Sequence, residues 1–458
     1  MNGASQELQK ALNEIRDTIV GDNKLYHQQI PLVDELTSSQ AYGQALLSLP
    51  SDLRNRFIGA LVNKISYTAF EIKYFQNPLI DLQRDEMPLG AIGEEIYINP
   101  ARGRVYNCDD FAGLLAKYSA DVKVEYTELN FDVQYPVTII RDELEKAFNS
   151  WGAFEEYLAG ITTSLYNGAY IDDYDFTRKL ITNAYSRNAV QMETFTFAGD
   201  IPTESELKSL VKKLRKDYKN FQIPSTKYNA WKKVGGYGRS VKTWANPDEI
   251  VVFLNNELAS DIDVEVLASA FHINETSLMG KIYYVEDFNI YDEDGNVAID
   301  GSNIIAFICD RRWFKIRSKK MFMDDFYNAS NRSWNSFLNV IKGFNYSIFT
   351  DGKMYVKALP TLNVSSMKFV DSNVEVNVGA NKTLLLNTEP FTATQTITFT
   401  LGAGESTYAS IEKIDNRNVK VTGLVATTGE SDVPSKVTIT ATAGNVTTSV
   451  DVVVKATA

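Results

Sequence analysis

Cysteine and histidine are scarce in this sequence of 458 residues, which contains two of each. Cys108 and Cys309 lie far apart in the chain, and His27 and His272 each stand alone. This scarcity excludes a disulfide framework, a Cys/His zinc site and a c-type haem. It also leaves little material for a Ser/His/Asp or Cys/His catalytic site.

Long apolar runs and an excess of positive charge are also lacking. No window reaches the ~18 uninterrupted apolar residues of a membrane span, and the N-terminal stretch MNGASQELQKALNEIRD carries charges at every turn. We therefore expect a protein made and kept in the cytoplasm, or released by lysis, with no membrane partner. Lys and Arg number 46 against 58 Asp and Glu, a net charge of −12, which disfavours a nucleic-acid-binding protein.

What the chain does have is enough length for about three domains and a change of composition near residue 360. After Leu362 there is no Trp, Cys or His, and short runs such as VEVNV, QTITFTL, NVKVTGLV and KVTITATA alternate apolar and polar residues. This alternation predicts an antiparallel β-sandwich in the tail. The runs VNVGANKTLLLNTEPFTAT, ITFTL and VTGLVAT resemble a bacterial immunoglobulin-like domain of the second group, with Phe399 where that family usually has a core Trp.

The first 360 residues mix helix and strand. Apolar residues at spacings of three and four predict an N-terminal helix opened by Ser5, a helix after Asp52, a basic amphipathic helix over 204–221 and a long helix over 151–185. A helix of ~30 residues is ~45 Å long, so this one is interpreted as a spine. IVVFLNNEL, KIYYVEDF, IIAFICD and KMYVKAL predict strands, VEVLASAF a further helix, and YDEDGNVAI a hairpin with an Asp-Gly turn.

Residues 81–130 show no sustained period, and a stretch this long is unusual inside a compact domain. We interpret it as a long two-stranded excursion, with VKVEYTEL and FDVQYPVTI as its returning edge.

Several motifs have a functional and a structural interpretation, and the structural one is favoured for each. His272 is expected at a partly buried helix end rather than in a catalytic site. The Asp292, Asp294 and Asn296 spacing imitates a calcium loop, but position twelve is Asn303 rather than Glu, which favours a plain hairpin. The GGYGR run at Gly235 lacks the residues that complete a phosphate-binding motif, which favours a flexible loop.

Carboxylate pairs and one basic helix remain. Glu94/Glu95, Glu155/Glu156 and Asp172/Asp173 could in principle serve a glycosidase, but adjacent carboxylates point apart, so solvated faces are expected. The run KSLVKKLRKDYKNF is expected to be a solvated outer face that could also meet an acidic partner or nucleic acid.

Three segments together resemble the major capsid protein of small short-tailed bacteriophages of the picovirus type, built on the Hong Kong 97 capsid fold. They are NPLIDLQRDEMPLGAIGEEIY at 77–97, LEKAFNSWGAFEEYLAGITTSLYNGAYIDDYDF at 144–176, and ELASDIDVEVLASAFHIN from Glu257 with the closing LMGKIYYVEDF. The resemblance covers nearly the whole chain. It implies an α+β capsid fold with a long spine helix and extended loop, followed by the C-terminal all-β immunoglobulin-like sandwich.

The resemblance also implies a division of the chain and a role. We expect an N-terminal arm at 1–76, an extended loop at 77–137, peripheral and axial domains at 138–360, and the immunoglobulin-like domain at 362–458. The role is that of a non-enzymatic shell protein, without cofactor, metal or catalytic residues, that assembles in the bacterial cytoplasm into an icosahedral or elongated virion head. Its expected partners are copies of itself in pentamers and hexamers, a scaffolding protein, a portal, and double-stranded DNA enclosed without sequence-specific binding.

Two other classes stay open at this stage. A surface or phage-tail adhesin would explain the tail domain, although no secretion signal or tandem β-modules are present. A polysaccharide-cleaving enzyme would explain the aromatic and acidic residues, but it needs a carboxylate pair in a cleft.

Overall fold

The computed structural model describes residues 6–20, 30–34, 36–68, 75–84, 93–107, 113, 115–199, 202–256, 258, 281–292, 294–429 and 433–456. The chain divides into two compact units. Unit 1 comprises 1–96, 124–178 and 314–346, and unit 2 comprises 97–123, 179–313 and 347–458. Each is described by itself.

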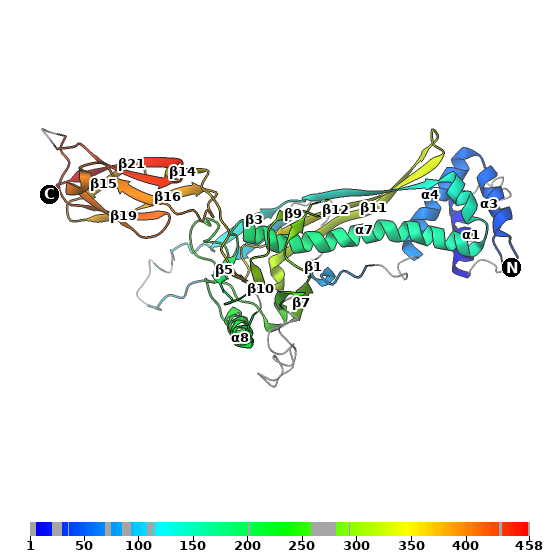
Figure 1. The fold of residues 1–458 in the computed structure, drawn as a ribbon, viewed down its shortest axis with the longest axis horizontal. Helices are drawn as coiled ribbons and strands as arrows, with labels where there is room; N and C mark the ends of the chain where they lie inside the picture. The colour runs from blue at the N-terminus through cyan, green and yellow to red at the C-terminus, as the bar shows by residue number, and fades with distance from the viewer. Residues whose placement is uncertain are drawn as a thin grey trace. The chain divides into compact units, whose positions relative to one another are not determined.

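Unit 1 is built on a four-stranded sheet in the order β1-β11-β12-β4. β11 (Phe314–Asn328) and β12 (Ser333–Tyr346) form a long antiparallel hairpin, β4 (Phe131–Ile140) pairs antiparallel with β12, and β1 (Gln83–Arg84) pairs parallel with β11. The long helix α7 (Trp151–Ser186) runs beside this sheet, as Figure 1 shows. The predicted spine helix is thus confirmed, at 36 residues.

The N-terminal helices pack together at one end of unit 1. They are α1 (Gln6–Val20), α3 (Ser39–Ser48) and α4 (Ser51–Thr68), and the short α6 (Arg141–Ala147) follows β4. Their apolar faces form one core with the first turns of α7, which includes the fully buried Phe57 and Phe154. Two tryptophan indoles fix this core to loops and helices, since Trp151 donates to the Thr37 carbonyl and Trp334 donates to the Asn55 side chain.

Two expectations about the strands of unit 1 are wrong or incomplete. The segment FDVQYPVTI is not the returning edge of an excursion, because as β4 it pairs with β12 over ten residues from Phe131 to Ile140. Between IIAFICD and KMYVKAL the sequence predicts no strand, whereas this region holds the β11–β12 hairpin.

Unit 2 contains a five-stranded sheet in the order β5-β13-β10-β6-β7. Its members are β5 (Gln191–Thr194), β13 (Gly352–Val356), β10 (Ile304–Asp310), β6 (Ile250–Asn255) and β7 (Lys281–Val285). β10 is buried along its whole length, as expected for a strand covered on both faces. The amphipathic α8 (Glu204–Phe221) covers one face with Leu207, Leu210, Val211 and Leu214, and a Thr203/Glu206 capping box opens it.

The predicted strands of unit 2 and its Asp-Gly hairpin are present. β8 (Ile290–Tyr291) and β9 (Val297–Ile299) pair antiparallel around Gly295, whose φ of 81° suits glycine. The predicted helix VEVLASAF, together with His27, Cys108 and His272, lies outside the described residues.

The tail of unit 2 folds into two four-stranded sheets with the predicted period-two alternation. The pairing is not antiparallel throughout as predicted, because β15 (Asn373–Asn377) pairs parallel with β21 (Val446–Lys455). One has the order β14-β16-β19-β18 and the other β15-β21-β20-β17. The strands are β14 (Ser366–Phe369), β15 (Asn373–Asn377), β16 (Asn381–Glu389), β17 (Thr398–Leu401), β18 (Ala409–Lys413), β19 (Asn418–Gly423), β20 (Val437–Ala443) and β21 (Val446–Lys455). Phe399 is only half-buried against this core, where Ile397 is fully buried, so Phe399 sits at the core's margin rather than at its centre.

Candidate assembly surfaces

The motifs with a possible catalytic or metal-binding interpretation have structural roles. The Asp292 carboxylate accepts hydrogen bonds from the backbone N–H groups of Asp294 and Asn296 and so closes the hairpin turn. In the described part of the chain, no group of three or more His, Cys, Asp or Glu side chains could hold a metal ion. Cys309 is fully buried in β10, and burial raises the pKa of its thiol well above the ordinary value.

The glycine-rich run at Gly235 is a turn tied down by a neighbouring lysine. The Lys232 ammonium donates to the carbonyls of Gly236 and Gly238, so this cation is already engaged within the loop. Gly235 and Gly238 adopt positive φ angles of 92° and 80°, a conformation that glycine reaches without strain.

The expectation that the adjacent carboxylates form solvated faces is wrong for two of them. Asp173 is buried and lies 2.5 Å from the Lys342 ammonium, while Glu95 lies 2.8 Å from the Lys315 ammonium in a nearly buried pair. Both pairs join segments of unit 1 that are distant in sequence. They are therefore structural ion pairs.

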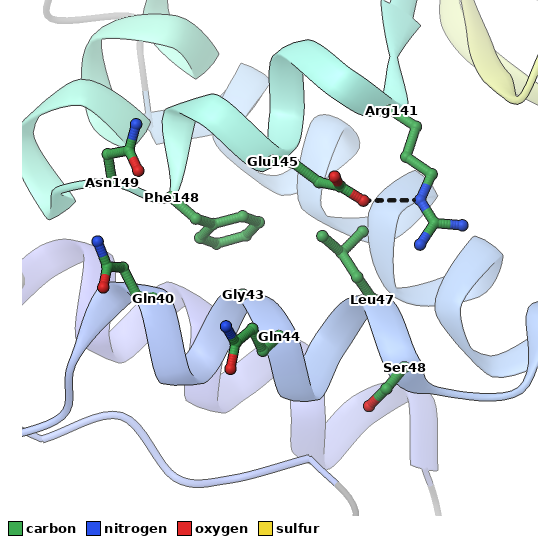
Figure 2. Close-up of a pocket in the computed structure, with 9 residues that line it drawn as sticks. All are labelled: Gln40, Gly43, Gln44, Leu47, Ser48, Arg141, Glu145, Phe148 and Asn149. Carbon is green, nitrogen blue, oxygen red and sulfur yellow. Dashed lines mark hydrogen bonds and ion pairs between the residues drawn. The ribbon is translucent and has the colours of Figure 1, made fainter.

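A cavity of about 560 Å³ lies between α3 and α6. Figure 2 shows Gln40 and Asn149 near one end of it and the Arg141–Glu145 ion pair, 2.9 Å, near the other. Glu145 is the only carboxylate among the lining residues and is already paired, so this cavity lacks the two carboxylates of a glycosidase site.

The most unusual surface is a two-stranded ribbon whose apolar side chains face solvent and whose polar side chains face the protein. β2 (Gly93–Ile98) and β3 (Val122–Thr127) form a two-stranded sheet, and alternate residues along each strand are exposed. The exposed positions are mostly apolar and are 42% to 65% accessible: Ile96, Ile98, Val122, Val124 and Tyr126. We call this set the outer face of the ribbon.

The opposite face of the ribbon carries polar side chains that contact the protein. Glu95 pairs with Lys315, and the Asn99 side chain just beyond β2 donates to the Ser240 carbonyl while accepting from the Lys242 N–H. Tyr97 donates to the Lys242 carbonyl and its ring stacks on Phe349 at 5.8 Å. A ribbon with its polar side inward and its apolar side in solvent is unfavourable for an isolated chain.

The sequence signal for this face was available but ambiguous. VKVEYTEL alternates apolar and polar residues, which identifies a strand, but alternation alone does not tell which side meets water. The usual assumption that apolar residues point inward gives the wrong orientation here.

A long helix beside a four-stranded sheet, a two-stranded ribbon and a five-stranded α/β unit together correspond to the Hong Kong 97 type of fold. This fold is similar to that in the capsid structure of Staphylococcus phage Andhra, with a TM-score of 0.50 at 16% identity over 62% of this chain and 85% of that one.

The chain belongs to the Phi29-like phage major capsid protein family, which matches residues 12–356. It is 25% identical to the major capsid protein of Bacillus phage B103 over 75% of this chain and 72% of the relative. It is 26% identical to that of Bacillus phage PZA, over 69% and 68%. It is thus a phage major capsid protein and a part of the virion, and no comparison supports the adhesin alternative. Among the described residues, no helix has the length and hydropathy needed to cross a membrane.

Proposed function

We propose that this capsid protein closes its shell by packing the outer face of the ribbon onto another copy of the chain. The observation that carries the proposal is the solvent-facing apolar set on β2 and β3. Each of these side chains is about half covered already, so complete burial would contribute roughly 1 kcal/mol apiece. Five such residues per contact, repeated around a shell, provide a substantial driving force.

The same proposal includes the division of labour along the chain. Residues 1–76 act as an arm, and 77–137 as the extended loop, whose last residues enter β4 at Phe131. Residues 138–360 act as the peripheral and axial domains, and 362–458 as an immunoglobulin-like domain that decorates or braces the shell. The two-sheet tail with its own core supports this last assignment. The copies form pentamers and hexamers with a scaffolding protein and a portal.

The assembled head encloses double-stranded DNA without sequence-specific contacts and without enzymatic activity, and it forms in the cytoplasm of the bacterial host. The net charge of −12 supports the first point, since a negative surface does not immobilise DNA through its phosphates.

The test replaces outer-face residues by charged ones. The double variant Ile96→Asp/Ile98→Asp should remain soluble but lose shells in negative-stain images of the protein expressed with its scaffolding protein. The matched control is Leu424→Asp/Val425→Asp, at tail positions with 44% and 47% exposure, which should still form shells. Normal shells from the ribbon variant would refute the proposed contact.

A further inference from the structure

Two segments of unit 2 carry opposite charge. Residues 208–219, in α8, contain six Lys or Arg and one acidic residue, Asp217, which is buried. Residues 282–310 contain no Lys or Arg and several exposed carboxylates. We call Lys212, Lys216 and Lys219 the basic face of α8, and residues 282–310 the acidic segment.

The basic face of α8 is available for an external contact. Lys208 and Lys213 are engaged within the unit, 2.6 Å from Glu204 and 2.6 Å from Glu193. Among the described residues, none forms a hydrogen bond or ion pair with the side chains of Lys212, Lys216 or Lys219. Their spacing of four and three residues places them along one stripe of the helix, opposite the buried leucines.

The acidic segment is likewise exposed. Glu286, Asp292, Asp294 and Asp300 all lie on the surface, beside the β8–β9 hairpin. The Asp292 and Asp300 carboxylates accept hydrogen bonds from backbone N–H groups of their own turns. Glu286 and Asp294 use their carboxylates for no hydrogen bond or ion pair with the described residues.

These two surfaces lie at different places on the five-stranded sheet, the basic one over a face and the acidic one at an edge. β5 is one edge strand and β7 the other. α8 covers one face of the sheet, where its apolar residues pack with β6 and β10. Its ion pairs reach β5 through Lys213 and Glu193, and β13 through Asp217 and Lys353, 2.7 Å apart. The acidic segment begins in β7 itself and continues directly into its hairpin.

We propose that the basic face of α8 binds the acidic segment of an adjacent copy of this chain within a capsomer ring. Ring contacts are heterologous, since one side of a subunit meets the opposite side of the next. A unit with a basic face on α8 and an acidic segment at the β7 edge has two different surfaces, so it satisfies that rule for every copy at once. This inference rests on the proposed assembly into rings, and it adds the surfaces that join neighbours around each ring.

DNA is the competing partner for a lysine stripe, and the structure favours the protein. Each copy of the chain carries one acidic segment and one basic face, so every basic face has a complementary surface on another copy. In addition, the net charge of −12 repels a polyanion such as DNA. Loss of DNA content from otherwise normal shells is therefore an outcome that would overturn the proposal.

The experiment uses charge reversal and its rescue in the full chain. Lys212→Glu/Lys216→Glu/Lys219→Glu should raise the subunit concentration needed for shells by about tenfold or more, because three weak surface attractions become repulsions. Glu286→Lys/Asp294→Lys should impair assembly in the same direction. The variant with all five substitutions restores opposite charges at each contact and should assemble better than either parent.

Controls separate this inference from folding defects and from the ribbon proposal. Lys368→Glu/Lys382→Glu/Lys455→Glu changes the net charge equally but lies in the tail sandwich, and it should assemble as the unaltered chain does. The milder Lys212→Gln/Lys216→Gln/Lys219→Gln variant, with a melting curve of the unassembled subunit, shows whether α8 stays folded. Unaltered assembly of the reversed α8 variant, or absence of rescue among folded variants, would overturn the inference. Absence of shells from the unaltered chain would instead refute the proposed function.

Discussion

Removing the carboxylate of Asp173 should destabilise unit 1 by about 3–5 kcal/mol. This carboxylate lies in α7 and is 2.5 Å from the ammonium of Lys342 in β12, with the two side chains only 3% and 10% exposed. The Gln83 amide donates to the same oxygen at 2.9 Å. The variant Asp173→Ala would leave the lysine charged, buried and without its anion, which costs far more than the loss of an exposed pair.

A double-mutant cycle distinguishes the cost of an orphaned charge from the net value of the pair. Lys342→Met alone should be destabilising by a similar amount, because it leaves Asp173 buried without its cation. The double variant Asp173→Leu/Lys342→Met should recover most of the loss, since an apolar pair of similar volume is often neutral or stabilising.

Urea unfolding of the unassembled subunit, followed by tryptophan fluorescence, measures these changes. Of the five tryptophans, Trp151 and Trp334 lie in unit 1, and both are buried. The control is Glu145→Ala, which breaks the exposed i,i+4 pair with Arg141 and should cost at most about 0.5 kcal/mol. A loss below about 1 kcal/mol for Asp173→Ala would refute the reasoning.

Three further predictions concern other parts of the chain. Gly43→Ala should lower the free energy of unfolding by about 1–3 kcal/mol, because the new Cβ would lie 2.5 Å from Cγ of Phe148. Gly160→Ala, whose Cβ would meet no side chain of the described structure within 4 Å, should raise the free energy of unfolding by up to about 1 kcal/mol. Both are measured by the same urea titration. Burial raises the pKa of Asp351 to about 7, so the unaltered chain should lose stability as the pH rises from the ordinary carboxyl range through 7, and melting curves of Asp351→Asn should lack this dependence. Residues 362–458 alone should show a cooperative melt, and a chain truncated after Val356 should still form shells; a non-cooperative tail or an insoluble truncated chain would contradict this.

The helices and the tail strands could be predicted because their signals are local. The 3.6-residue period along α8 placed its ends at Glu204 and Phe221. The quoted segments of the tail identified five of its strands, β15, β16, β17, β19 and β20. In each case a residue's neighbours within a few positions determine which side is buried, so no distant partner is needed.

The parts that failed depend on partners far away in sequence. β11 contains KIRSKKMFMDDFYN, where lysines and acidic residues interrupt any alternation, and it becomes a strand by pairing with β12 over its whole length. Asp173 is 169 residues from Lys342, and nothing near it in α7 distinguishes a carboxylate facing the sheet from one facing water. The orientation of the ribbon was also not predictable, because alternation along a strand does not tell which of its two faces meets water.

The two proposed contacts between copies differ in their physical origin, and this difference should separate them in assembly. Attraction between the basic face of α8 and the acidic segment is screened over about 8 Å at physiological ionic strength and over about 3 Å at 1 M salt. Burial of the ribbon's outer face is not weakened by salt, and sulfate strengthens it. Raising the salt concentration should therefore weaken contacts around a capsomer ring while preserving the ribbon contact. The charge-reversed α8 variant has repulsion in place of attraction at this contact, so salt should improve the assembly of this variant. Salt should impair the assembly of the unaltered chain. This opposite dependence on salt cannot arise from a folding defect.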